Sequence, residues 1–165
     1  MEGLSIDTAS LRDVRQIMQL ERACFGKDAW PILDIMGALV WPGGVRLKAA
    51  LRKRVVGLVI AEPAGSGGVS MITTIGVDPA FRRRGIASAL LSRCEELLPG
   101  GRIRLTVRAD NSAAIRLYER FGYAYQNRLL RYYRDGQAGL VMEKDRGRTH
   151  SAPADRVRKE PGWEI

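Results

Sequence analysis

The fold is decided by one stretch, Ile75-Gly76-Val77-Asp78-Pro79-Ala80-Phe81-Arg82-Arg83-Arg84-Gly85-Ile86-Ala87. It has the pattern of a strand end, a proline, a loop with consecutive arginines and a helix that begins at Gly85. Such an arrangement brings backbone N–H groups, the positive end of a helix dipole and fixed positive charge together. It therefore predicts a site that cradles a phosphate group.

Length and composition limit what surrounds this stretch. The chain of 165 residues is long enough for one domain with a substantial core. It is 45% hydrophobic and 27% charged, which is ordinary for a soluble globular protein. No apolar run approaches the roughly 18 residues of a membrane span, and the N-terminus lacks the pattern of a secretory signal. We therefore expect a cytoplasmic protein with no membrane partner.

The few cysteines and the one histidine exclude several kinds of site. Cys24 and Cys94 are too few and too far apart to suggest a disulfide framework or a metal site. The only histidine, His150, lies in a polar segment near the C-terminus. A Ser-His-Asp triad and a multi-histidine metal site in the core are thereby excluded, and we expect no bound metal.

The net charge of +9 lies almost wholly in the body of the chain. Residues 145–165 carry five basic and four acidic side chains, which leaves +8 for the rest. A positive body favours a polyanionic partner such as a nucleic acid, an acidic peptide or a phosphate-bearing cofactor. Composition alone does not choose among these partners.

The first half of the chain alternates between strand and helix patterns. Ser10 can cap a helix, and Pro31 suits the first turn of another. The basic residues 52–54 separate two β-rich runs and predict a hairpin. We expect strands over residues 4–8, 45–51, 55–62 and 69–77 and helices over residues 11–24 and 31–39.

The second half predicts a mixed sheet. Apolar residues recur at helical spacing after Gly85, and Asp135-Gly136 is a strong turn signal. The strand, helix and strand between residues 71 and 107 require a right-handed parallel crossover. We expect helices over residues 85–98 and 113–121 and strands over residues 103–107, 123–133 and 138–143.

These elements predict an α/β (α+β) fold with a mixed, mostly antiparallel sheet of about six or seven strands and about four helices. No internal repeat or linker interrupts the chain before residue 145. We therefore expect one domain over residues 1–144. Residues 145–165 lack apolar periodicity, which predicts a disordered tail.

Several motifs in this order carry a family resemblance. They are Val77-Asp78-Pro79, Arg82-x-x-Gly85-x-Ala87, Asn111 and Leu117-Tyr118-x-x-Phe121-Gly122-Tyr123. By these residues the chain resembles the GNAT superfamily of acetyl-CoA-dependent N-acetyltransferases, over about residues 4–144. Tyr132-Tyr133, followed by Ala138 and Met142, resembles the branch that acetylates protein N-termini, which includes the ribosomal-protein alanine acetyltransferases.

The resemblance implies a single GNAT-type domain with acetyl-CoA as cosubstrate. It implies that the strand backbone at residues 75–77 pairs with the pantetheine arm and that amides of residues 83–88 hold the pyrophosphate. No Walker or dinucleotide glycine motif competes with this interpretation. The implied cofactor residues are Ile75, Gly76, Val77, Arg82, Arg83, Arg84, Gly85, Ile86, Ala87, Ser88 and Asn111.

The resemblance also implies catalytic residues. Tyr118 matches the general acid, because a phenol can share a proton with the thiolate that leaves. The residue before Val-Arg is a glutamate in the ribosomal-protein enzymes, but here it is Thr106, which cannot act as a base at neutral pH. The amine proton can then leave through ordered water or to another carboxylate, such as Glu62 or Asp28. Trp30, Tyr132 and Tyr133 are candidates for acceptor contacts.

Three functions therefore stay open. The first is an N-acetyltransferase for a protein or peptide amine, with the N-terminal α-amine favoured. The second is a GNAT acetyltransferase of a small-molecule amine. The third is a non-catalytic basic module for nucleic acid, which the charge permits but for which the sequence shows no recognised binding motif. The oligomeric state does not follow from the sequence.

Overall fold

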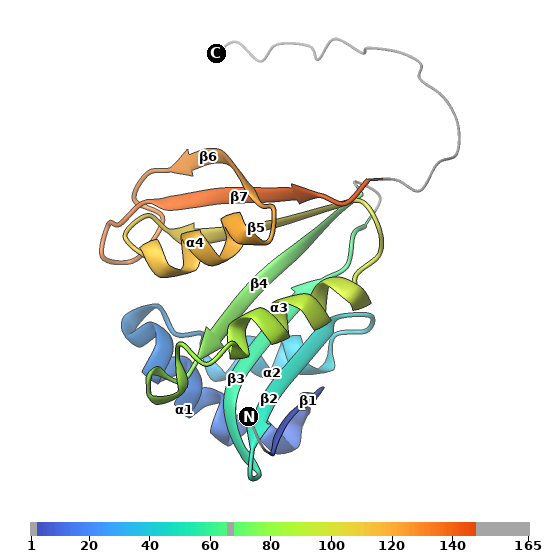
Figure 1. The fold of residues 1–165 in the computed structure, drawn as a ribbon. Coiled ribbons are helices and arrows are strands. Elements are labelled where there is room, and N and C mark those ends of the chain that lie inside the picture. Colours follow the sequence, from blue (N-terminus) through green and yellow to red (C-terminus); the bar gives the residue numbers. More distant parts are fainter. Residues whose placement is uncertain (1–2, 66–67, 148–165) are drawn as a thin grey trace.

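A computed structural model, which describes residues 3–65 and 68–147, contains one seven-stranded sheet and four α-helices (Figure 1). The strands are β1 (Leu4–Thr8), β2 (Val45–Leu51), β3 (Arg54–Glu62), β4 (Val69–Val77), β5 (Arg102–Arg108), β6 (Ala124–Leu129) and β7 (Gly139–Asp145). The helices are α1 (Val14–Phe25), α2 (Ile32–Val40), α3 (Ile86–Leu97) and α4 (Ser112–Arg120). None of the helices in these ranges has the length and apolar character that a membrane crossing demands.

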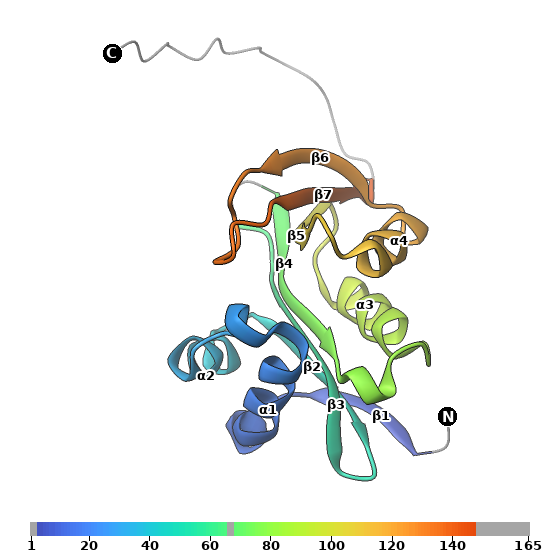
Figure 2. The same cartoon turned by 90° about the vertical axis from the view of Figure 1, so that its left-hand side faces the viewer.

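The sheet is mixed, as the sequence predicts. Its strand order is β1-β2-β3-β4-β5-β7-β6, and every neighbouring pair is antiparallel except β4 and β5. The parallel pair is joined through α3. Figure 2 shows α1 and α2 on one face of the sheet and α3 and α4 on the other.

The strands β4 and β5 separate halfway along their length. They pair over Val69–Ile72 and Arg102–Leu105, and both strands then continue without pairing to each other. In Figure 1 they diverge like the arms of a V. The edge of β4 that faces β5 is therefore free over residues 73–77, although its other edge stays bonded to β3.

Two apolar clusters hold the layers together. The larger one packs α3 and α4 on one face of the sheet, with Leu90, Leu91 and Cys94 fully buried. The smaller one packs α1 and α2 on the other face, with Ile17 and Ile35 at its centre. The periodicity that predicts these helices is thus the pattern of their buried residues.

Local signals explain where the first helices begin. Leu11–Asp13 forms a 3₁₀ turn before α1, and the Asp13 carboxylate accepts the Ser10 N–H at 2.9 Å. Pro31 stands just before α2 rather than within it. These differences shift the predicted helix bounds by a few residues only.

The predicted strand over residues 123–133 is too long. The strand β6 ends at Leu129, and Arg131 has a φ of +51° that an extended chain cannot adopt. The predicted Asp-Gly turn is present, since Gly136 donates its N–H to the Tyr133 carbonyl at 2.8 Å. Tyr132 and Tyr133 consequently lie in the β6–β7 connection and not in the sheet.

The region around residue 145 contacts the helical layer. The strand β7 extends to Asp145, and the Arg146 guanidinium binds the carbonyls of Glu95, Leu98 and Pro99 at the end of α3. A cation at this end of a helix interacts favourably with the helix dipole. The predicted disorder of the tail from residue 148 onward lies outside the described residues.

Candidate active site

The separation of β4 and β5 opens a groove of about 1620 Å³. A typical pocket for one small ligand has roughly 300–1,000 Å³, so this groove has room for two substrates. Its walls come from the end of α1, the free part of β4, the start of α3, the end of β5, α4 and the β6–β7 connection. Segments far apart in the sequence therefore share one site.

One wall fits a phosphate-bearing cofactor. The free edge of β4 over residues 73–77 offers backbone groups to an extended ligand, and the start of α3 lies next to it. Gly85 has a φ of +77° and directs the chain into the helix, while Ile86, Ala87 and Ser88 supply N–H groups that have no partner within it. These backbone groups are of the kind that the amides of pantetheine and the oxygens of a pyrophosphate can bind.

The strand β4 contains an irregularity at Thr73 and not at its only glycine, Gly76. The register between β3 and β4 shifts so that Thr73 has no partner across the ladder. Gly76 pairs normally with Leu58, but a Cβ added to it would lie 3.1 Å from Cys24 Sγ and from Phe25 Cζ. Gly76 therefore allows α1 to approach the strand, and Thr73 forms the bulge.

The three consecutive arginines have separate surroundings. The Arg82 Nε donates to the Val77 carbonyl at 3.1 Å and thereby fixes the end of β4. Arg83, with a φ of +62°, lines the groove. The Arg84 guanidinium lies 5.4 Å from the Phe81 ring and does not line the groove. Only Arg82 and Arg83 therefore place their charge beside the predicted pyrophosphate position.

Tyr118, the predicted general acid, lines the groove from α4, the helix that shares a face of the sheet with α3. It is 5% exposed, and its ring packs edge-on against Tyr123 with 5.8 Å between centroids. The Tyr123 hydroxyl in turn donates to Glu95 at 2.9 Å, which fixes this ring pair. Burial raises the pKa of Tyr118 well above its ordinary value. The phenol therefore keeps its proton throughout the neutral range. Asn111, also in the groove, caps α4 by accepting the Ala114 N–H at 3.1 Å.

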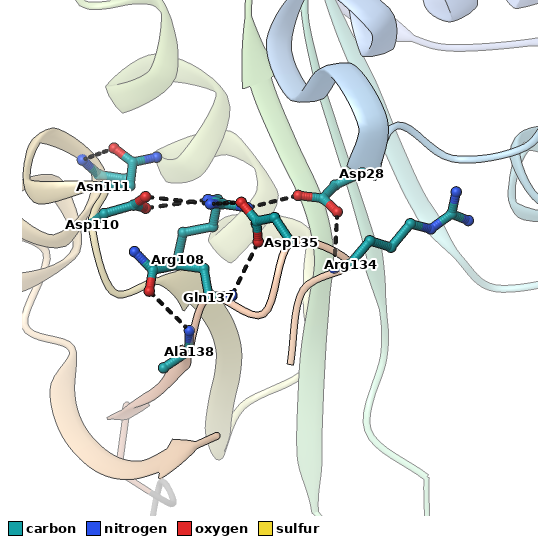
Figure 3. Close-up of polar contacts among 9 residues, drawn as sticks. Asp28, Arg108, Asp110, Asn111, Arg134, Asp135, Gln137 and Ala138 are labelled. Carbon is teal, nitrogen blue, oxygen red and sulfur yellow. Dashed lines mark hydrogen bonds and ion pairs between the residues drawn. The ribbon is translucent and has the colours of Figure 1, made fainter. Parts of the chain in front are cut away.

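An ion cluster centred on Arg108 closes the other end of the groove (Figure 3). The guanidinium bonds Asp28 at 2.7 Å, Asp135 at 2.6 Å and Asp110 at 3.2 Å. It also lies 4.8 Å from the centre of the Tyr133 ring. One side chain from the end of β5 therefore joins the loop after α1, the loop before α4 and the β6–β7 connection.

The cluster shifts the protonation of its members. Hydrogen bonds from Arg108 lower the pKa of Asp110 and of Asp135, and the same bonds raise the pKa of Arg108. Burial raises the pKa of Tyr133 to about 12. Both aspartates are thus fully ionised and held by a cation, which makes them weak proton acceptors at neutral pH.

The structure separates the remaining candidates. Trp30 and Tyr133 line the groove, and so does Thr106. Tyr132, 53% exposed, is outside it and packs edge-on against Tyr133 with 5.0 Å between centroids. Glu62 is exposed at the end of β3 and does not line the groove, so its position gives no support to a role as base.

Sequence reasoning does not single out Arg108 or Glu21. Glu21 is 3% exposed on α1, where its carboxylate accepts the Thr74 hydroxyl at 3.1 Å and the Trp30 N–H at 3.4 Å. Its spacing of four residues from Ile17 and three from Cys24 places it on the apolar face of α1. An acidic residue in that stripe was the available signal. Nothing local marks Arg108, whose partners are distant in sequence.

Comparisons with known proteins agree with this geometry. Residues 13–123 match the acetyltransferase (GNAT) family. The N-alpha-acetyltransferase RimI of Mycobacterium tuberculosis is 32% identical over 150 residues, which are 88% of this chain and 95% of that protein. The catalytic subunit NAA20 of the Arabidopsis thaliana N-terminal acetyltransferase B complex is 32% identical over 110 residues, 63% of either chain.

Solved structures share the fold. The ribosomal-protein-S18-alanine N-acetyltransferase of Escherichia coli superposes with a TM-score of 0.80 at 21% identity, covering 92% of this chain and 99% of that one. Arabidopsis thaliana NAA60, solved in complex with acetyl-CoA, gives a TM-score of 0.73 at 20% identity over 85% and 97% of the two chains. The chain therefore belongs to the GNAT family of acetyltransferases, enzymes that take their acetyl group from acetyl-CoA.

Proposed function

We propose that this chain transfers the acetyl group of acetyl-CoA to the N-terminal α-amine of a protein or peptide. The observation that carries the proposal is the groove with two different walls, one suited to phosphates and one closed by the Arg108 cluster. The similarity to RimI, named as an N-alpha-acetyltransferase, supports the same substrate class.

The charged residues of the groove favour oppositely charged ligands in different parts of it. Arg82, Arg83, Arg116 and Arg120 precede α3 or lie on α4, with Glu119 as the acid beside them. At the end of the groove that the Arg108 cluster closes, three aspartates outnumber Arg108 and Lys27. A cleft wall of one sign raises the local concentration of the opposite charge. The first wall therefore favours a polyphosphate, and the second favours an amine that arrives as ammonium.

In this assignment the residues have distinct tasks. The free edge of β4 orients the thioester, the start of α3 holds the pyrophosphate, and Tyr118 donates a proton to the departing sulfur. We also place the reaction in the cytoplasm, in line with the free thiols of Cys24 and Cys94.

The test is acetylation of matched amines. The protein is incubated with acetyl-CoA and one of three acceptors. These are a lysine-containing peptide with a free N-terminus, the same peptide with its N-terminus blocked, and spermidine. Intact mass should show acetylation of the first peptide only. Acetylation of spermidine without the peptide would instead support a small-amine enzyme, and polyanion binding without any acetyl transfer would support the nucleic-acid module.

A further inference from the structure

Glu21 is a buried carboxylate without a countercharge. No lysine, arginine or histidine within residues 3–65 and 68–147 forms an ion pair with it. Within the part of the chain that the structure describes, it accepts two hydrogen bonds, from the Thr74 hydroxyl and from the Trp30 N–H. Burial raises its pKa above the ordinary value, and these bonds do not offset that effect. Keeping such a group costs stability, which calls for a functional reason.

Thr74 connects this carboxylate to the groove. It lies on β4 between the Thr73 bulge and Gly76, in the part of the strand that has separated from β5. It is 8% exposed and lines the groove, while Glu21 lies behind it. Because its hydroxyl hydrogen is directed at Glu21 Oε1, the oxygen lone pairs are left to accept a hydrogen bond from a group in the groove.

The other carboxylates of the groove are poorly suited to take a proton. Asp28, Asp110 and Asp135 are all bound to Arg108. Glu119 follows Tyr118 directly on α4, and neighbouring residues in a helix point about 100° apart. The exposed Glu119 therefore points away from the direction of the buried Tyr118. Thr106 offers no carboxylate at all.

We propose that Glu21 is the final proton acceptor of the acetyl transfer and receives the amine proton through the Thr74 hydroxyl. This inference rests on the proposed function. Thr74 is then the group that contacts the acceptor amine, and Glu21 acts through it. Thr74 and Glu21 together supply the proton acceptor that Thr106 cannot provide.

The step balances without a further reagent. The arriving ammonium first releases one proton to water in the groove. The neutral amine nitrogen then forms a bond to the thioester carbon, and the carbon–sulfur bond breaks with its electron pair on sulfur. The amine proton passes to Thr74 Oγ1 while the original hydroxyl proton passes to Glu21 Oε1. The thiolate takes a proton from Tyr118. The Glu21 proton then returns through Thr74 to water in the groove, and Tyr118 regains a proton from water, which leaves an amide and a thiol.

Few charged groups face Glu21 from the elements packed around it. The Cys24 thiol lies on the same helix, with the Arg82 guanidinium beside that thiol. The strand β3 contributes Leu58 and Ile60 to the apolar cluster on this face, and α2 contributes Ile35 and Leu39. The turn after α1 carries Lys27 and Asp28, which line the groove. The surroundings therefore keep the proton affinity of Glu21 high.

The test compares four variants. Glu21→Gln keeps an acceptor oxygen but cannot accept the proton, and Thr74→Val removes the hydroxyl at similar volume. Thr74→Ser restores a hydroxyl, and Glu96→Gln changes an exposed glutamate of α3 as a matched control. For each variant kcat and the KM of acetyl-CoA are measured from acid to alkaline pH on a peptide acceptor, together with the melting temperature.

The relay predicts a defined pattern. Glu21→Gln and Thr74→Val lower kcat by about 10²- to 10⁴-fold, the range for a lost general base, with little change in the KM of acetyl-CoA. Thr74→Ser recovers much of the loss, and Glu96→Gln behaves as wild type. The wild-type kcat falls at acid pH, where Glu21 is already protonated, and Glu21→Gln lacks this limb of the pH profile. Glu21→Gln melts no lower than wild type.

Two other results would overturn the inference. If Glu21→Gln and Thr74→Val keep wild-type kcat and pH dependence, the relay is wrong while the proposed function stands. If Glu21→Gln does not fold, Thr74→Val and Thr74→Ser decide the question by the same comparison, and equal rates for both refute the relay. Failure of the wild type to acetylate any peptide would refute the proposed function and the relay together.

Discussion

At the scale of single residues, environment and not residue type decides chemical role. Tyr118 and Glu21 both have their pKa raised by burial, but one thereby keeps a proton to donate and the other gains affinity for a proton. Asp135 has the opposite shift because Arg108 stabilises its ionised form. The groove thus contains a tyrosine that keeps its proton and an ion cluster whose aspartates stay ionised, and the candidate base Glu21 lies behind Thr74.

Tyr118→Phe isolates the acid. The phenyl ring still packs against Tyr123, so folding and the KM of acetyl-CoA should change little. We expect kcat to fall by about 10²- to 10⁴-fold, the range for a lost general acid. Steady-state kinetics with a peptide acceptor measure the change, and an unaltered kcat would remove Tyr118 from the mechanism.

Gly76→Ala tests the close approach of α1. The added Cβ would lie 3.1 Å from Cys24 Sγ and Phe25 Cζ, so overpacking should lower the free energy of unfolding by about 1–3 kcal/mol. The cost should be smaller in a Cys24→Ala background. Gly37→Ala is the control, because its Cβ meets nothing within 4 Å and alanine should stabilise α2 by about 1 kcal/mol. Denaturant unfolding measures both changes, and equal changes in the free energy of unfolding for Gly76→Ala and Gly37→Ala would contradict this account.

At the scale of elements, the ion cluster links three connections that share no hydrogen-bonded ladder. The loop after α1, the loop before α4 and the β6–β7 connection meet through Arg108 alone among the described ion pairs. Arg108 holds the three loops together with two further hydrogen bonds, from the Arg134 N–H to the Asp28 carboxylate at 3.4 Å and from the Ala109 N–H to the Ala138 carbonyl at 2.9 Å. The Arg108 cluster therefore contributes strongly to the shape of the acceptor wall.

Asp135→Asn should loosen the β6–β7 connection selectively. The lost charge weakens the contact to Arg108, so we expect faster amide hydrogen exchange over residues 130–138 and a higher KM for the peptide, with the KM of acetyl-CoA unchanged. Arg93→Gln breaks an exposed pair on α3 and serves as the control. Unchanged exchange over residues 130–138 would show that the loop is held by other contacts.

At the scale of the whole molecule, the charged groups give the stability a defined pH dependence. The pKa values of Asp110 and Asp135 are lowered in the folded state, so their stabilisation is present above the unfolded pKa near 4 and is lost as the pH falls through the lower folded values. Glu21 has the opposite sign, because its stabilising protonated form is lost as the pH rises through its raised pKa.

The melting temperature should therefore fall as the pH drops below about 4. Asp135→Asn should flatten part of that fall. Glu21→Gln should gain stability relative to wild type as the pH rises from acid to neutral, since it avoids ionising a buried group. Calorimetry of the three proteins over this range checks both signs, and parallel curves would refute the assignments.

Much of the fold could be predicted because its signals are local. The strand Val69–Val77 and the helix that begins after Gly85 are where periodicity and turn residues place them. The strand over residues 123–133 was predicted too long, because the positive φ of Arg131 leaves no mark in the residue type. Of the predicted site residues, Tyr118 and residues 85–88, which motif order singles out, line the groove, whereas Glu62 does not, because exposure is not readable from spacing.

The sequence by itself predicted most of the elements, the mixed sheet and a phosphate-binding start of α3, because the signals for each lie close together along the chain. Only the tertiary structure decided which groups meet in the groove. The separation of β4 from β5, the joining of Asp28, Asp110 and Asp135 by Arg108, and the burial of Glu21 behind Thr74 all depend on contacts between segments distant in sequence. Burial and charge at those contacts set the pKa values, and no local pattern contains them.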